Sequence, residues 1–174
     1  MRKVALITDG WRRLFTYAWP VGILQRIRET GEDVNLYIFN STGNWSRDAG
    51  YNRAEYNIYN LPELSDFDGI ILELNNISSP AVLADVISNA KRSGRPVVSI
   101  ANELGDFYYV GIDNYSAMKQ VIAHLHEVHD CKKFWLLVGA QDNYESSCRL
   151  QGMLDYAKEH KIKIDKDDIW YGSF

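Results

Sequence analysis

The chain has 174 residues, of which 46% are hydrophobic and 13% aromatic, which is enough for one domain with a real core and part of a second. Its formal net charge of -4 argues against a nucleic-acid-binding surface, because phosphate contacts need clustered Lys and Arg. The N-terminal apolar run is too short for a signal peptide and no run reaches the length of a membrane span, so we expect a cytoplasmic chain without membrane contact.

Short apolar runs alternate with amphipathic stretches along the chain. Runs rich in Val, Ile, Leu and aromatic residues predict buried strands at 3–8, 34–39, 69–74, 96–100, 108–112 and 134–139. Helical spacing predicts helices at 18–30, 79–93, 115–129 and 146–160. The polar and aromatic segment 40–62 predicts a loop with a short, irregular helix. The alternation predicts an α/β fold whose parallel strands are joined by right-handed crossovers.

Polar and aromatic residues follow several of the predicted strands. They form the stretches "TDGWRRLFTY", "ANELGDF" and "AQDNYESSCR". In parallel sheets ligands bind at the carboxyl ends of the strands, where helix N-termini and loops converge. Aromatic faces beside forked hydrogen-bonding groups suit a polyhydroxylated or ring-bearing small molecule.

The sequence patterns of common catalytic and metal sites are absent. There is no GxGxxG after the first strand, no GxxxxGK[ST] and no GxSxG. Cys131 and Cys148 lack CxxC spacing, and the segment "HLHEVH" (124–129) lacks HExxH, so we expect no metal and no cofactor. One alternative stays open, since Asp9 at a strand end fits a flavodoxin-like α/β enzyme or phosphoacceptor that uses strand-end carboxylates to hold Mg²⁺.

The order of several short motifs resembles the effector-binding domain of the LacI/GalR family, a periplasmic-binding-protein-like fold of type I. These motifs are an apolar strand before Asp113-Asn114, a helix ending in His124-Leu125, a strand closing in Gly139, and Arg149 with Gly152 opening a helix. The stretches "FDGIILELNN", "RPVVSIANEL" and "IWYGSF" also resemble strands of that family.

The resemblance implies a three-layer, Rossmann-like N-terminal lobe at 1–129 and the beginning of an incomplete C-terminal lobe at 130–174. It implies a non-enzymatic sensor that takes a sugar-like or nucleoside-like effector between two lobes and acts as a homodimer. The family's helix-turn-helix does not precede the first strand here. We therefore expect a DNA-binding or GGDEF-type diguanylate cyclase output module outside this chain.

The resemblance also implies which residues contact the ligand, with a structural alternative for most of them. The expected ligand-binding residues are Trp11, Phe15, Tyr17, Asn102, Asn143, Glu145 and Arg149. Arg149 would fork onto ligand hydroxyls or a carboxylate, unless it is a helix-surface arginine in an ion pair. The aromatic residues would stack on a ring, or pack against 40–62, and Asn102 is otherwise a plain turn residue. Asp113 and Asn114 are expected to cap a helix rather than to act in catalysis or metal binding.

Overall fold

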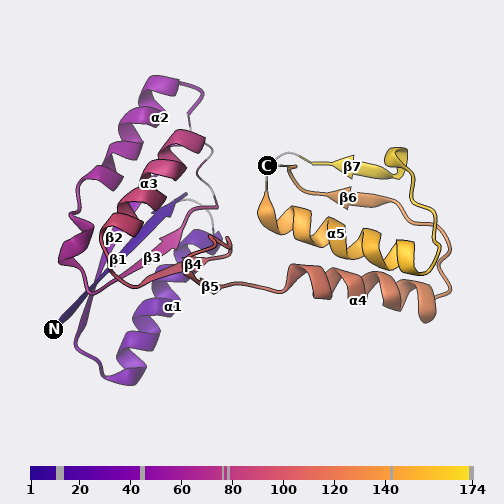
Figure 1. Ribbon diagram of the computed structural model, residues 1–174, viewed down its shortest axis with the longest axis horizontal. Coiled ribbons are helices and arrows are strands. Elements are labelled where there is room, and N and C mark those ends of the chain that lie inside the picture. Colours follow the sequence, from indigo (N-terminus) through magenta and orange to yellow (C-terminus); the bar gives the residue numbers. More distant parts are fainter. Residues whose placement is uncertain (11–13, 44–45, 76, 78, 142, 173–174) are drawn as a thin grey trace. The chain divides into compact units, whose positions relative to one another are not determined.

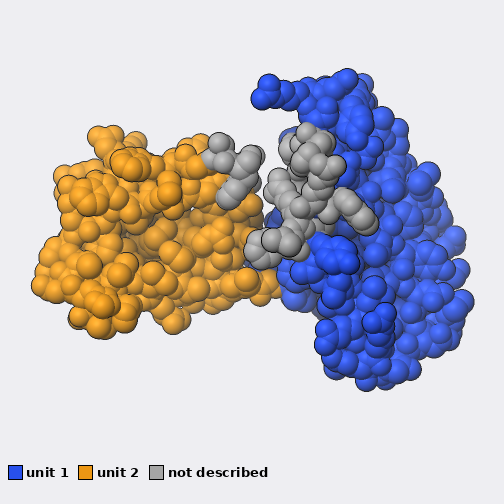
Figure 2. Space-filling view, turned by 180° about the vertical axis from the view of Figure 1, so that it is seen from behind, with its two compact units in different colours: residues 1–110 blue, residues 111–174 orange. Residues whose placement is uncertain are grey.

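The computed structural model describes residues 1–10, 14–43, 46–75, 77, 79–141 and 143–172 (Figure 1). The chain forms two compact units, Met1–Val110 and Gly111–Phe174, which are coloured separately in Figure 2. This division lies before the predicted helix at 115–129, whereas the expected lobe boundary at 129/130 lies after it. No helix in the described part of the chain is long and apolar enough to cross a membrane.

Unit 1 is built around a parallel sheet with the strand order β2-β1-β3-β4-β5. The strands are β1 (Arg2–Asp9), β2 (Val34–Ser41), β3 (Gly69–Glu73), β4 (Val97–Ile100) and β5 (Tyr108–Val110). Helix α1 (Leu14–Thr30) covers one face, and α2 (Ala49–Glu55) and α3 (Pro80–Arg92) cover the other (Figure 1). The predicted three-layer α/β fold is therefore confirmed.

The core of unit 1 follows from the alternation of side chains along the strands. Ala5 and Ile7 of β1 face a buried cluster that also contains Val86 and Ala90 of α3. Two 3₁₀ turns, η1 (Tyr56–Asn60) and η2 (Leu64–Asp66), complete this layer with buried side chains. The predicted start of α3 is confirmed, since Ser79 caps it and Pro80 is its first residue.

Among the predicted boundaries in unit 1 that differ from the structure are the start of α1 and the end of β5. Helix α1 begins at Leu14 rather than at 18, and it runs through Pro20. Pro20 is the seventh residue of α1, beyond the first turn, so the helix continues through it with one internal hydrogen bond missing. Strand β5 ends at Val110, two residues before the predicted end, because the chain leaves the sheet edge there.

Unit 2 is a smaller α/β unit. It contains α4 (Asn114–Glu127), β6 (Leu136–Val138), α5 (Tyr144–Glu159), the 3₁₀ turn η3 (Lys166–Asp168) and β7 (Ile169–Tyr171). The strands β6 and β7 pair in parallel, and α4 and α5 lie side by side (Figure 1). Its buried core consists of Ile122, Phe134, Leu136, Val138, Met153 and Tyr156.

The close approach of α4 and α5 depends on Gly152. A Cβ atom at this position would overlap the backbone carbonyl oxygen of Tyr115 and lie 3.3 Å from the backbone nitrogen of Lys119. The two helices are also joined by a hydrogen bond that Tyr115 Oη donates to Asp155 Oδ2 at 2.9 Å. The glycine of the Arg-x-x-Gly motif therefore has a packing role.

Candidate functional site

The N-termini of α4 and α5 are each closed by a side chain. Asp113 Oδ1 accepts a hydrogen bond from the backbone N–H of Ser116 at 2.9 Å, and Asn143 Oδ1 accepts one from Ser146 at 2.9 Å. These bonds satisfy helical N–H groups that have no partner within the helix. The bond from the Ser116 backbone, followed by that from its hydroxyl, holds the pKa of Asp113 below its ordinary value.

Asn114 connects the two helices just inside these caps. It is only 8% exposed, and its Oδ1 accepts a hydrogen bond from Arg149 Nη1 at 2.8 Å. Its Nδ2 donates at 3.3 Å to Glu145 Oε1 and to the backbone oxygen of Ile112. Asn114 is thus the first residue of α4 rather than its cap, and its amide fixes both charged neighbours.

Within the described residues, the guanidinium of Arg149 has N–H donors that remain available to a ligand. Of its five N–H donors, one is used by the neutral amide of Asn114. Arg149 forms no salt bridge with the carboxylates in the described part of the chain. Its positive charge, on the second turn of α5, favours negative or electron-rich ligand atoms. The arrangement can bind a carboxylate or adjacent hydroxyls.

The structure groups four residues of interest in unit 2 and leaves the others apart. Asn114, Asn143, Glu145 and Arg149 lie together at the starts of α4 and α5. Trp11 lies outside the described residues, as does the side chain of Phe15.

The remaining two predicted ligand residues lie in unit 1. Tyr17 is 62% exposed on α1, so packing against 40–62 does not bury it. Asn102 is half-buried in the bend after β4, and its backbone oxygen accepts from Ser99 Oγ at 2.6 Å.

A second polar cluster occupies the carboxyl edge of the sheet in unit 1. Asp9 and Glu73 end the adjacent strands β1 and β3 and are 0% and 3% exposed. Thr8 Oγ1 donates to Glu73 Oε2 at 2.8 Å, and Tyr59 Oη donates to the backbone oxygen of Thr8 at 2.9 Å. Burial, together with the neighbouring Asp9 carboxylate, raises the pKa of Tyr59 well above its ordinary range. The tyrosine is therefore a neutral hydrogen-bond donor.

Sequence reasoning named Asp9 but missed its neighbours. Glu73 had a visible signal, since it is an acidic residue inside the apolar run "GIILEL". Tyr59 had none, because 40–62 lacks periodicity and its fold is set by contacts distant in sequence. In the described residues, no group of three or more His, Cys, Asp or Glu side chains is arranged to hold a metal ion.

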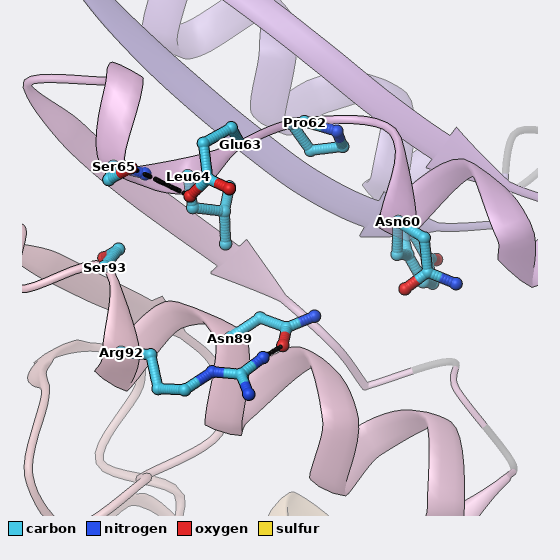
Figure 3. A pocket seen from close by; sticks show the side chains of 9 residues that line it. Asn60, Pro62, Glu63, Leu64, Ser65, Asn89, Arg92 and Ser93 are labelled. Carbon is cyan, nitrogen blue, oxygen red and sulfur yellow. Dashed lines mark hydrogen bonds between the residues drawn. The ribbon is translucent and has the colours of Figure 1, made fainter.

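A pocket of about 350 Å³ in unit 1 lies between α3 and the turns η1 and η2 (Figure 3). Its polar side chains bond to their own neighbours, since Arg92 Nη2 donates to Asn89 Oδ1 and Ser65 Oγ donates to Glu63 Oε1 at 2.8 Å. Its lining residues at 62–65 and 89–93 precede β3 and β4 in the chain, whereas parallel sheets bind ligands at the carboxyl ends of their strands. It is a weaker candidate than the cluster around Arg149.

No protein-family model matches the chain, and no curated protein matches it in sequence. Solved structures do match its fold. The transcription regulator CcpA of Lactococcus lactis superposes with a TM-score of 0.70 at 19% identity, over 100% of this chain and 59% of that one. The chain has the fold of LacI-type regulators.

Two further structures support this fold. A sugar-binding LacI-family transcriptional regulator from Escherichia coli, solved with phosphate, has a TM-score of 0.70 at 18% identity, over 99% of this chain and 58% of its own. A periplasmic binding protein/LacI transcriptional regulator from Alkaliphilus metalliredigens, solved with D-xylulofuranose, has a TM-score of 0.64 at 18% identity, over 100% and 57%. The chain thus spans less than two thirds of each. These regulators give no support to a GGDEF-type output.

Proposed function

We propose that this chain is a non-enzymatic, small-molecule-sensing domain that passes the binding of a sugar-like or nucleoside-like effector to a transcriptional output. The observation that carries the proposal is the match to LacI-type regulators along 98–100% of the chain. One of those regulators is named as sugar-binding and another is bound to a pentulose. The function of this chain is inferred from them.

The cluster around Arg149 supplies groups that suit such a ligand. Its guanidinium offers N–H donors in a fixed plane, and the Glu145 carboxylate beside it offers acceptors. Adjacent hydroxyls of a sugar need one donor and one acceptor each, so this pairing supports recognition of a diol. Lysine could not reproduce the planar fork.

The proposal is tested by a saturation-transfer NMR screen of the chain against pentoses, hexoses and ribonucleosides at millimolar concentration. We expect transfer to at least one of these ligands, and loss of that transfer in Arg149→Ala. Mg²⁺ with acetyl phosphate forms the comparison arm, because a phosphoacceptor would use Asp9 instead. Transfer that is unchanged in Arg149→Ala, or a response only to Mg²⁺ with acetyl phosphate, would reject the proposal.

The proposed function also involves two protein partners for this chain. We propose a homodimer, and an output module outside residues 1–174 that binds DNA, because the structural neighbours are transcription regulators. Analytical ultracentrifugation of the chain, with and without the effector from the screen, tests the dimer. A monomer at every concentration would remove this part of the proposal.

A further inference from the structure

All four histidines of the chain lie in unit 2, and two of them face each other. Nε2 of His124, in the last turn of α4, lies 3.1 Å from Nε2 of His129. Both side chains are exposed to solvent. The ring centroids are 4.9 Å apart and the ring planes cross at 77°.

The backbone brings these two rings together. Val128 caps α4, and its N–H bonds to the oxygen of His124. Asp130 then adopts a left-handed conformation with φ of 53°, and the N–H of Cys131 bonds back to the oxygen of Leu125 at 3.0 Å. Together, the left-handed residue and this bond reverse the chain after α4. This reversal returns His129 to the helix surface beside His124, so the pair is preorganised by the main chain.

The geometry of the pair fits a common metal ion. For metal–nitrogen bonds of about 2.05 Å, a separation of 3.1 Å corresponds to an angle of about 98° at the metal. With the metal at this position, and with each ring aligned along its Nε2–metal bond, the ring centroids would be about 4.8 Å apart. This is close to the 4.9 Å observed. An in-line N–H···N hydrogen bond of the same length would place them about 5.4 Å apart. The observed separations are compatible with lone pairs that converge on one ion, and also with a bent hydrogen bond between the two rings.

The neighbouring side chains are engaged elsewhere. His126 Nδ1 lies 3.0 Å from the hydroxyl of Tyr156, and His160 stacks on the Tyr156 ring at 4.1 Å. The carboxylate of Asp130 pairs with Lys132. No third ligand completes the site within the described residues, so the remaining coordination positions are left to water or to an external ligand.

We propose that His124 and His129 form an open, two-histidine site for a borderline divalent transition metal ion, with Zn²⁺ and Cu²⁺ as the chemical class. Imidazole is a preferred ligand of both ions, and an angle between 90° and 109° lies between their square-planar and tetrahedral geometries. The site is independent of the effector cluster around Arg149. An open coordination position gives it the capacity to recruit a further ligand.

The site is tested by titrating the 174-residue chain with Zn²⁺ at pH 7.5 in calorimetry, and with Cu²⁺ in electron paramagnetic resonance. We expect one ion per chain and nitrogen couplings from two imidazoles. His124→Gln and His129→Gln should each weaken binding at least tenfold. His160→Gln is the matched control, since it removes a nearby histidine that does not face the pair, and it should bind as the parent does.

Circular dichroism keeps the outcomes interpretable, because both substituted side chains are exposed and the variants should remain folded. An affinity that is equal in the parent and in the folded His124→Gln, His129→Gln double variant would overturn the proposal. So would an equal loss in His160→Gln, because the ion would then bind elsewhere on the histidine-rich end of unit 2.

Discussion

Replacing Gly152 by alanine should destabilise unit 2, although alanine is the better helix former. The added Cβ would overlap the backbone carbonyl oxygen of Tyr115, lie 3.1 Å from its carbonyl carbon and lie 3.3 Å from the backbone nitrogen of Lys119. Ordinary carbon contacts begin near 3.5 Å. All three atoms belong to the backbone of α4, so no side-chain rotation relieves the overlap and the two helices must separate.

The expected size of the effect follows from two opposing terms. Overpacking of a close contact costs about 1–3 kcal/mol, and a clash with backbone belongs to the upper part of that range. Alanine returns about 1 kcal/mol through its helix propensity. The net loss should therefore be about 1–2 kcal/mol in the stability of unit 2.

Gly22 of α1 provides the matched control, because a Cβ there meets no atom within 4 Å. Gly22→Ala should stabilise unit 1 by up to about 1 kcal/mol, since only the propensity term acts. Hydrogen exchange with mass spectrometry measures the two units separately through peptides from α1 and from α4 and α5. If Gly152→Ala slowed exchange in α4 and α5, as Gly22→Ala should do in α1, the close-packing argument would be refuted.

Three further changes have defined outcomes. Arg149→Lys should weaken effector binding in calorimetry by about ten- to hundredfold, since the planar fork is lost, with little change in melting temperature; equal affinity would end its role. Tyr156→Phe removes the hydroxyl that donates to Glu127 and should lower the free energy of unfolding of unit 2 by about 1 kcal/mol, measured in urea. An unchanged midpoint would show that this bond does not stabilise unit 2. The capping bond lowers the pKa of Asp113, so its stabilisation is complete above about pH 3.9 and is lost as pH falls through the lower folded-state pKa. Asp113→Asn keeps the cap, and its urea midpoint should therefore fall less below pH 4 than that of the parent, while identical curves would contradict this assignment.

The strands and helices were predictable because they depend on local pattern. Apolar runs located six strands, and Ser79-Pro80 located the start of α3. Helix α2 was expected only as a short, irregular helix in 40–62, because none of its residues is buried and it shows no apolar stripe. Phe134 was placed in a strand, yet β6 begins at Leu136. Its burial comes from packing in the core of unit 2, which produces the same apolar signal as a strand.

The candidate site was predictable only in part. The resemblance located Arg149 and the Asp113-Asn114 junction, but it did not distinguish the cap from its neighbour. Asp113 accepts the helical N–H of Ser116, and Asn114 instead holds the guanidinium. The contact between His124 and His129 was not predicted, because the left-handed residue Asp130 cannot be recognised from a sequence without glycine at that position.

The central claim is that Arg149, which Asn114 holds beside Glu145, binds a small-molecule effector. The most direct measurement is a two-dimensional NMR titration that follows the Arg149 guanidinium and the Asn114 side-chain amide while a sugar or nucleoside from the screen is added at millimolar concentration. Our account predicts saturable shifts of both groups, and no shift of the pocket residues Asn89 and Arg92. Shifts at Asn89 and Arg92 with Arg149 unmoved, or no saturable shift anywhere in the chain, would contradict it.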